Sequence, residues 1–508
     1  MQLLMGEILD RARHGDPTKI AVTLGDDELT FAQVDDGANQ MANALAVIGV
    51  GYKDVVVWWS EISLRTVEGF FALARLGAAF APINPRFSLD EAVPVLQYLH
   101  PRLLVVDHDH AEMAGELCRQ LGIGLAVFAT GGATVPGHDL DQLTATASIQ
   151  FITEPQLDEK DPHAVFLTSG STGVPKGVVL SHRTSWLRAA WSAENGSHHD
   201  GRPGDTICMF PLFHWAGWAY LTGGWQSHAA IHFVHRAEPD QLLATAERRR
   251  VNVMYCIPGV WRRILAHTEP KYDLSSLERV NTGTSAVTID LLSQLKARFP
   301  GTLTSVAYGS TEGGGGADLH DAELFAKPGS VGRPNKYLEI RLADDGEVCK
   351  RSVALMDGYF ERPVETAEAL QDGWYHTGDL GEFDDEGFLW IIGRKREVIR
   401  SGGETIAPVE IEEAIRKLPG IRDAAVIGVP DDNWGEVVSA VLVLDDTRAC
   451  PTIEELRSHV RNLAPHKHPR QVFTIDAIPR TPATGQVRRA FLRELVLASA
   501  GPAIASDS

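Results

Sequence analysis

The chain has 508 residues, of which 44% are hydrophobic and 22% charged, a composition typical of globular proteins. It is too long for one ordinary hydrophobic core, so we expect two or more domains. The formal net charge of -20 at pH 7 argues against nucleic acid or an anionic membrane surface as a partner, and an anionic substrate would have to be bound by local donors.

Cysteine use and the absence of targeting features predict a cytoplasmic protein. The segment from Met1 to Arg13 is neither a signal peptide nor a transit peptide, because it carries acidic residues and alternates apolar with polar positions. No apolar run approaches the roughly 18 residues that a transmembrane helix needs. The five cysteines are scattered without a CxxC pair, which suits a reducing compartment: Cys118, Cys208, Cys256, Cys349 and Cys450.

Strands and helices are predicted to alternate through the first 130 residues, as in parallel α/β layers. The expected strands are Ile20 to Leu24, Leu29 to Phe31, Asp54 to Trp59, Ala78 to Ile83, Leu103 to Asp107 and Gly124 to Phe128, and the expected helices are Asp35 to Ile48 and Arg65 to Leu76. The segment from Gly131 to Gln156 is rich in Thr, Gly and Asp and is predicted to be a loosely structured connection.

A hydroxyl- and glycine-rich loop, Thr168 to Gly177, follows a predicted buried strand at Ala164 to Leu167. Glycines let the backbone approach a ligand, the Ser and Thr hydroxyls can bond phosphate oxygens, and Lys176 adds a positive charge. This pattern predicts a polyphosphate-binding loop, with a flexible surface loop as the alternative. It is not a Walker A loop, because Pro175 and Gly177 flank the lysine.

Beyond this loop, short polar segments recur at the ends of predicted strands. The chain then closes with a smaller set of elements: predicted helices at Val409 to Lys417 and Ile453 to Arg461, and strands at Ala424 to Val429 and Val437 to Leu444. These elements predict a small α+β unit.

The loop resembles the signature loop of the adenylate-forming superfamily of acyl-CoA synthetases, luciferases and free-standing adenylation domains. The resemblance extends over nearly the whole chain through segments that match in the same order: Phe213 to Gly217, Tyr308 to Glu312, Trp374 to Leu380 and Gly393 to Glu412. It implies an α/β fold with a large N-terminal domain of layered α/β subdomains, residues 1–395, and a small, mobile α+β C-terminal domain, residues 396–508. The hinge would lie near Arg396, where the family usually has Lys or Asp.

The resemblance also implies how Mg·ATP would be bound. Tyr308 would stack on adenine, Thr311 would reach the α-phosphate, and Glu312 would ligate Mg²⁺. Asp379 and Arg394 would hold the ribose, since a carboxylate accepts two hydrogen bonds at once. The remaining residues assigned to ATP are Thr168, Ser169, Gly170, Ser171, Thr172, Gly173, Lys176, Gly309 and Ser310.

The acid and CoA sites follow from the same resemblance. His214 would gate or orient the carboxylate, and Trp215 would narrow the acyl pocket, although Trp215 and Trp218 equally suit a hydrophobic core. Gly283 would line that pocket, in a segment where Ser285 and Ala286 depart from the family pattern. Gly402 and Gly403 would face the pantetheine of CoA. The glycine run from 313 to 316 predicts either a close approach to ligand or a mobile loop.

One residue departs from the family's catalytic pattern. Gln486 occupies the place of a lysine that bridges the substrate carboxylate and the α-phosphate. Glutamine keeps hydrogen-bonding capacity and loses the charge, which typically costs about 10²- to 10³-fold in rate. Arg488 and Arg489, two and three residues away, are candidate substitutes for the lysine; in a strand, Arg488 would share the face of Gln486 and Arg489 would not. We therefore hypothesise slow adenylation with the thioester-forming half reaction intact.

The sequence thus predicts an AMP-forming acyl-CoA synthetase that activates an apolar carboxylic acid with ATP and transfers it to CoA. A fatty acid is favoured, and a homodimer is left open. Two alternatives remain: a nucleotide- or acyl-CoA-binding pseudoenzyme, suggested by Gln486, and an adenylating ligase for aryl acids or a separate carrier protein.

Overall fold

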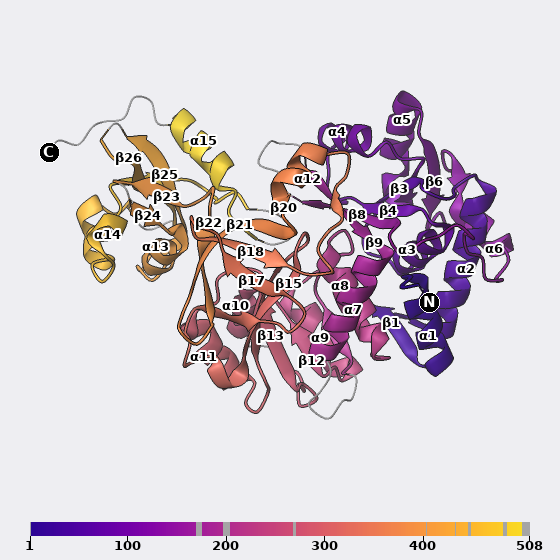
Figure 1. Cartoon of the computed structure of the whole chain (residues 1–508), viewed down its shortest axis with the longest axis horizontal. Coiled ribbons are helices and arrows are strands. Elements are labelled where there is room, and N and C mark those ends of the chain that lie inside the picture. The colour runs from indigo at the N-terminus through magenta and orange to yellow at the C-terminus, as the bar shows by residue number, and fades with distance from the viewer. Residues whose placement is uncertain are drawn as a thin grey trace.

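The structure is a computed structural model of the chain (Figure 1). It describes residues 2–168, 175–196, 204–267, 271–402, 404–431, 433–445, 449–480 and 485–499. Figure 1 shows a large body that runs from the indigo N-terminal elements to the orange strands, and a smaller yellow lobe at one end. The predicted α/β fold with a large N-terminal part and a small C-terminal part is confirmed.

The first sheet contains the two strands that flank the predicted polyphosphate loop. Its central strands are parallel, with β9 antiparallel to β8 at one side, so the loop from 169 to 175 joins two neighbouring strands. Within the described residues the strand order is β19 (Gly358–Tyr359), β9 (Lys176–Ser181), β8 (Pro162–Thr168), β4 (Ala79–Pro82), β3 (Val55–Trp59), β5 (Leu103–Asp107), β6 (Gly124–Phe128) and β7 (His138–Asp139). The inner strands are buried on both faces, as parallel strands usually are.

The second sheet is longer and brings the other polar segments to its middle. Its described strands run in the order β17 (Glu339–Leu342), β18 (Glu347–Arg351), β21 (Trp374–Phe383), β22 (Leu389–Arg394), β16 (Ser330–Pro334), β15 (Gly314–His320), β14 (Ser305–Ser310), β13 (Arg279–Gly283), β12 (Val253–Tyr255), β10 (Thr206–Cys208), β11 (Ile231–Phe233), β1 (Ile20–Leu24) and β2 (Asp27–Thr30). β20 (Leu370–Gln371) pairs with β21.

The C-terminal lobe has its own sheet and its own hydrophobic clusters. The described strands follow the order β24 (Glu404–Ile406), β23 (Ile399–Ser401), β26 (Gly435–Leu444) and β25 (Ile421–Asp431), with β27 (Gln471–Thr474) paired to β26. Two buried clusters, on the two faces of this sheet's long hairpin, contain residues from Ile399 onward and none from the large body. The lobe therefore has a separate core, as an independently placed domain needs.

Helices cover both large sheets, and several begin at side-chain caps that the sequence provides. Thr30 forms a capping box with Gln33, and Ser88 forms one with Glu91. Each box satisfies backbone N–H groups at the start of its helix. The helices are α1 (Gly6–Gly15), α2 (Phe31–Val47), α3 (Leu64–Leu76), α4 (Leu89–Leu99), α5 (Ala111–Leu121), α6 (Leu140–Thr146), α7 (His182–Gly196), α8 (Trp215–Gln226), α9 (Pro239–Arg249), α10 (Pro258–Ala266), α11 (Ile289–Arg298), α12 (Pro363–Ala369), α13 (Pro408–Ile415), α14 (Ile453–His459) and α15 (Arg489–Ser499). Among the described residues, no helix combines the length and the apolar character needed to cross a bilayer.

Three predictions of local structure are wrong. The helix predicted from Asp35 begins at Phe31, because the Thr30 capping box sets the start one turn earlier. The segment expected to be a loosely structured connection contains β7 and α6, whose first turn is capped by the Asp139 side chain. Gln486 and Arg488 do not lie in a regular strand: Val487 makes one isolated bridge to Arg480, and α15 begins at Arg489.

Candidate functional site

The ends of β8 and β9, which flank the predicted polyphosphate loop, lie near Glu312. Thr168, the last residue of β8, directs its hydroxyl to Oε1 of Glu312 at 3.3 Å. Lys176 begins β9, and its Nζ lies 4.8 Å from the centroid of the Tyr359 ring. The hydroxyl of Tyr359 donates to the same Glu312 oxygen at 3.4 Å. Five loop residues of the prediction lie outside the described residues: Ser169, Gly170, Ser171, Thr172 and Gly173.

The segment from Tyr308 to Glu312 comprises the end of β14 and the start of the turn that leads into β15. Ser310 caps this turn, because its Oγ accepts from the backbone N–H of Gly313 at 2.9 Å. Gly309 pairs with Gly315, and a Cβ at Gly309 would lie 2.7 Å from the carbonyl oxygen of Gly314. Glycine is therefore required at 309 for the two strands to approach.

Asp379 joins two of the predicted segments. Its Oδ2 accepts from the Tyr308 hydroxyl at 2.5 Å, and its Oδ1 forms an ion pair with Arg394 Nε at 2.9 Å. Asp379 and Arg394 are register partners in β21 and β22, so the sheet itself fixes the ion pair. The predicted adenine and ribose residues thus converge on one buried carboxylate.

Arg188 is a site residue that the sequence reasoning missed. It lies on α7, wholly surrounded by protein, and donates to the carbonyl oxygens of Thr311 at 2.7 Å and Glu312 at 2.9 Å. Its Nε donates to the carbonyl of Ala354 at 2.9 Å. Burial lowers the pKa of Arg188 to about 10, which leaves it charged at neutral pH. No sequence signal marks it, because its partners are backbone groups more than a hundred residues away.

His214 stands at the N-cap position of α8, but its side chain makes no capping hydrogen bond. Its Nε2 is shielded from solvent and has no hydrogen-bond partner among the described residues. Burial lowers the pKa of His214 to about 4, so the ring is neutral at pH 7. A neutral, unpaired imidazole nitrogen can accept or donate one hydrogen bond, which suits orientation of a substrate carboxyl group.

The two tryptophans beside His214 take part in packing. Trp218 is fully buried, stacks on Phe70 at 3.8 Å between ring centroids, and donates its indole N–H to the carbonyl of Leu212. Trp215 is 6% exposed and contacts Phe166 edge to face. Trp218 therefore belongs to the hydrophobic core. The Trp215 ring faces Arg188, whose guanidinium carbon lies 5.8 Å from the ring centroid.

Gly283 ends β13 in a conformation that only glycine adopts easily. Its φ is +153°, and a Cβ would lie 2.2 Å from the carbonyl oxygen of Ala307. The next residue, Thr284, hydrogen-bonds the Tyr255 hydroxyl at 3.0 Å. This fixed turn is where the two parts of the molecule meet, since Nε2 of Gln486 donates to the carbonyl of Thr284 at 3.4 Å.

The positions of Arg488 and Arg489 differ from those assumed when an arginine was considered as a substitute for the missing lysine. Arg489 is bound to Glu397 and Glu412 at 2.9 and 2.6 Å, so it serves the packing of the C-terminal lobe. The guanidinium carbon of Arg488 lies 4.9 Å from the Phe491 ring centroid, on an exposed side chain. The shared strand face assumed for Gln486 and Arg488 does not exist, because the segment is irregular.

The predicted CoA-facing segment lies in the C-terminal lobe. Gly402 occupies the turn between β23 and β24 with φ +59°, and a Cβ there would lie 2.7 Å from the Trp434 ring. Trp434 is 42% exposed, and the guanidinium carbon of Arg470 lies 4.0 Å from the centroid of its ring. Gly403 lies outside the described residues, and Arg396, the predicted hinge residue, is exposed.

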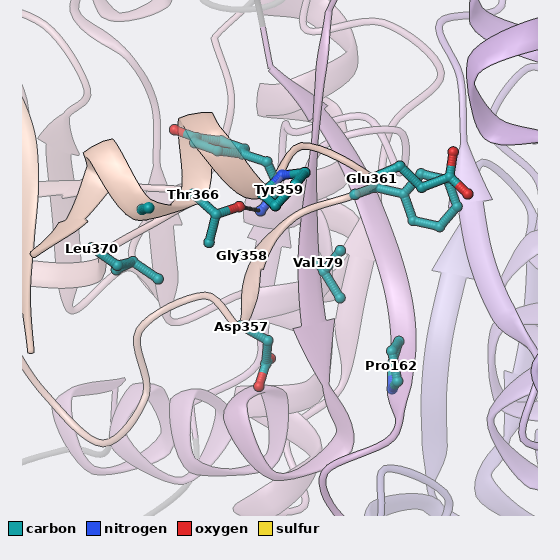
Figure 2. A pocket seen from close by; sticks show the side chains of 11 residues that line it. Pro162, Val179, Asp357, Gly358, Tyr359, Glu361, Thr366 and Leu370 are labelled. Atoms are coloured by element: carbon teal, nitrogen blue, oxygen red, sulfur yellow. Dashed lines mark hydrogen bonds between the residues drawn. The ribbon is translucent and has the colours of Figure 1, made fainter.

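A cavity of about 530 Å³ adjoins the site through Tyr359. Figure 2 shows its lining residues on β19 and α12, where the Thr366 hydroxyl accepts from the Tyr359 backbone N–H. The lining is mostly apolar and includes Val179, Pro363 and Leu370. None of the predicted site residues within the described ranges lines this cavity.

Comparisons with known proteins identify the family of the chain. The family model described as AMP-binding enzyme matches residues 9–360, and that of the AMP-binding enzyme C-terminal domain matches residues 410–484. The indoleacetate–CoA ligase of Aromatoleum aromaticum is 31% identical over 97% of this chain and 98% of its own. The long-chain-fatty-acid–CoA ligase FadD13 of Mycobacterium tuberculosis is 28% identical over 92% of this chain and 93% of its own.

A solved structure shows the same fold over the whole chain. The anthranilate CoA ligase AuaEII, crystallised in complex with anthranoyl-AMP, is 26% identical, covers 98% of both chains and has a TM-score of 0.87. The predicted relationship to adenylate-forming enzymes, and the predicted class of acid–thiol ligase, are confirmed. The chain belongs to the AMP-binding enzyme family, with both its N-terminal and its C-terminal domain present.

Proposed function

We propose that this protein is an AMP-forming acyl-CoA synthetase that activates an apolar carboxylic acid. The carboxylate attacks the α-phosphate of Mg·ATP and releases pyrophosphate, and the thiol of CoA then displaces AMP from the acyl-AMP. The observation that carries the proposal is the convergence of Thr168, Glu312, Tyr308 and Asp379 from two sheets into one site. Positioning and charge stabilisation then drive the first step.

The described residues assigned to the ribose and to Mg²⁺ have chemical roles that their positions support. Asp379 has one oxygen on Tyr308 and one on Arg394, and ribose hydroxyls would share this acceptor. Glu312 is a hard carboxylate beside the Thr168 hydroxyl, a donor set that suits Mg²⁺ with its retained waters. The ion would neutralise phosphate charge as pyrophosphate leaves.

The acid would approach from the side of His214 and Gly283. Trp215, Phe210 and Tyr255 supply apolar surface near these residues, which favours an acid with an aliphatic or aromatic body. The relatives named above act on indoleacetate, long-chain fatty acids and anthranilate, so both acid classes belong in the proposal. The fatty acid favoured from the sequence stays a prediction.

The two half reactions would be separated by rotation of the C-terminal domain about a hinge near Arg396, with residues 1–395 and 396–508 as the moving parts. The contact of Gln486 with Thr284 supports an adenylation-like arrangement, because it brings the Gln486 segment to the acyl side of the site. Rotation would exchange this segment for the Gly402 turn, which we propose faces the pantetheine of CoA. The five cysteines are all free, which supports a reducing, cytoplasmic setting.

A pseudoenzyme is the second candidate, and Gln486 is the observation that favours it. The deciding experiment measures pyrophosphate release from Mg·ATP with a panel of aliphatic and aryl acids, with and without CoA, together with the mass of any CoA ester. Acid-dependent release with formation of the ester supports the proposed function, and the responding acids assign the substrate class. Binding of ATP without release would support the pseudoenzyme.

A matched pair of variants ties the measured activity to this site. Glu312→Gln removes the proposed Mg²⁺ ligand and should abolish most pyrophosphate release. Glu361→Gln changes an exposed carboxylate that lines the separate cavity and should leave release unchanged. Equal loss in both variants would contradict the assigned site.

A further inference from the structure

Lys350 is a buried lysine whose amine has no hydrogen-bond partner among the described residues. It lies on β18, opposite Tyr375 of β21, and is 0% exposed. Its Nζ lies 4.2 Å from the centroid of the Tyr308 ring, which is cation–π distance. A lysine is almost never fully buried without a partner, so this amine calls for a reason.

The glycine run after Glu312 is shaped around Lys350. A Cβ at Gly316 would lie 2.7 Å from the Lys350 amine, and a Cβ at Gly313 would lie 3.1 Å from its Cδ. A Cβ at Gly314 would similarly lie 3.1 Å from Nε of Arg188. The run therefore leaves room for the side chains of two buried cations, Lys350 and Arg188. This is a structural role for the glycines that the sequence alone did not assign.

The electrostatic surroundings keep the amine charged without pairing it. Burial lowers the pKa of Lys350 to about 8, while the carboxylates of Asp379 and Glu312 favour the charged form and Arg188 and Arg394 oppose it. The amine is mostly protonated at pH 7. Neither carboxylate lies within ion-pair distance of Nζ in the part of the chain that the structure describes.

We propose that Lys350 is a positioning residue for the nucleotide: its buried ammonium holds the Tyr308 ring and places a positive charge in the pocket that an adenine nucleotide enters. The inference rests on the proposed function, since it assumes that Tyr308 and Asp379 bind adenosine. The ammonium fixes the ring from one side, and the hydroxyl of the same ring is fixed by Asp379 at 2.5 Å. The anionic nucleotide then supplies the negative charge that the protein does not place beside Lys350.

Removing the charge of Lys350 should therefore weaken nucleotide binding and leave the stability of the free protein equal or higher. A charge buried without a partner destabilises the free protein, and removing it should relieve that cost. A residue that only fills space would behave differently, because truncating or altering it would lower stability and leave the electrostatics of binding unchanged. The two roles are therefore separable by measuring both quantities on the same variants.

The test compares Lys350→Met and Lys350→Gln with the wild-type full chain by calorimetric titration with Mg·ATP and with AMP. Both variants keep a side chain only one atom shorter and lose its charge, and each should bind both nucleotides about 5- to 30-fold more weakly. Lys350→Met should also unfold at the same or a higher temperature than the wild type. Should one variant fail to fold, the other still carries the comparison.

Lys53→Met is the matched control. Lys53 is exposed and lies 4.8 Å from the Tyr52 ring, so the same substitution removes a solvent-exposed lysine–tyrosine contact away from the site. Its nucleotide affinity should equal that of the wild type. Wild-type affinity in either folded Lys350 variant would overturn this inference alone, whereas a wild-type protein that binds no ATP would overturn the proposed function and this inference together.

Discussion

Tyr308 and Asp379 are joined by a hydrogen bond of 2.5 Å that links β14 to β21. The bond places an aromatic ring and a carboxylate as one unit, with Arg394 on the second carboxylate oxygen. The bond is therefore the natural first target for mutagenesis.

Asp379→Asn should weaken Mg·ATP binding about 10- to 100-fold. The amide cannot accept on both sides as the carboxylate does, and hydrogen bonds to charged groups contribute about 1.5–3 kcal/mol. Tyr308→Phe is the matched variant, because it removes the same hydrogen bond and keeps the ring; it should lose less than about 10-fold. Calorimetric titration measures both, and equal losses would mean that Asp379 acts only through Tyr308.

Gln486→Lys should raise the rate of acid-dependent pyrophosphate release by about 10²- to 10³-fold, since it restores a positive charge where charge develops in the first step. Thioester formation from chemically supplied acyl-AMP and CoA should not change, because the Gln486 segment would be rotated away. An unaltered adenylation rate would refute the account of Gln486. Asn462→Lys, at an exposed position of the same lobe, serves as a charge control with no expected effect.

Arg188→Met should destabilise the fold by about 2–5 kcal/mol and abolish most activity. It removes a buried guanidinium that donates to three carbonyls, and each buried carbonyl left unsatisfied costs about 1–3 kcal/mol. Arg183→Met on the same helix removes a 41%-exposed side chain, and its effect should stay below about 1 kcal/mol. Urea unfolding compares the two; similar midpoints would show that Arg188 is not required to hold the Thr311–Glu312 turn.

Gly283→Ala should destabilise the protein by more than about 2 kcal/mol and disturb the Thr284 turn, because a methyl group would meet the Ala307 carbonyl at 2.2 Å and φ is +153°. Gly259→Ala provides the opposite expectation. It lies in α10 with nothing within 4 Å of a new Cβ, so the change should stabilise by about 0.5–1 kcal/mol. Thermal unfolding of the pair checks both signs, and a neutral Gly283→Ala would contradict the described turn.

Stability should fall between pH 6.5 and pH 4 through His182. This histidine is fully buried, and its Nδ1 accepts from the backbone N–H of Met5 at 3.2 Å. Burial lowers its pKa from 6.5 to about 4, so within this window the unfolded chain binds a proton that the native chain does not. The stabilisation is complete above pH 6.5 and decreases as pH falls, by about 2 kcal/mol between pH 7 and pH 5.

His182→Asn tests the source of this pH dependence. Asparagine keeps an acceptor near the position of Nδ1 and cannot be protonated in this range. Its unfolding free energy should therefore vary less between pH 7 and pH 5 than that of the wild type, by about 2 kcal/mol. His100→Asn, at a side chain that is 71% exposed, should keep the wild-type slope. Identical slopes in all three proteins would exclude His182 as the origin.

The sequence by itself determined the family, the α/β class and the identity of most candidate ATP residues. Loops such as Thr168 to Gly177 and turns such as Tyr308 to Glu312 are local: their hydroxyls, glycines and charges are contiguous, so their chemistry can be recognised without knowing what lies opposite. The same locality explains why strands such as β5 and β6 were predicted with their observed bounds.

Only the tertiary structure decided which residues support that chemistry from elsewhere. Arg188 donates to backbone carbonyls, and Lys350 lies against a ring and two glycines; neither kind of contact leaves a mark on the neighbouring sequence. The tertiary structure likewise assigned Trp218 to the core and bound Arg489 to two glutamates. The physical reason is that packing, burial and electrostatic fields depend on distances between residues far apart in the chain, which the fold sets and a local pattern does not contain.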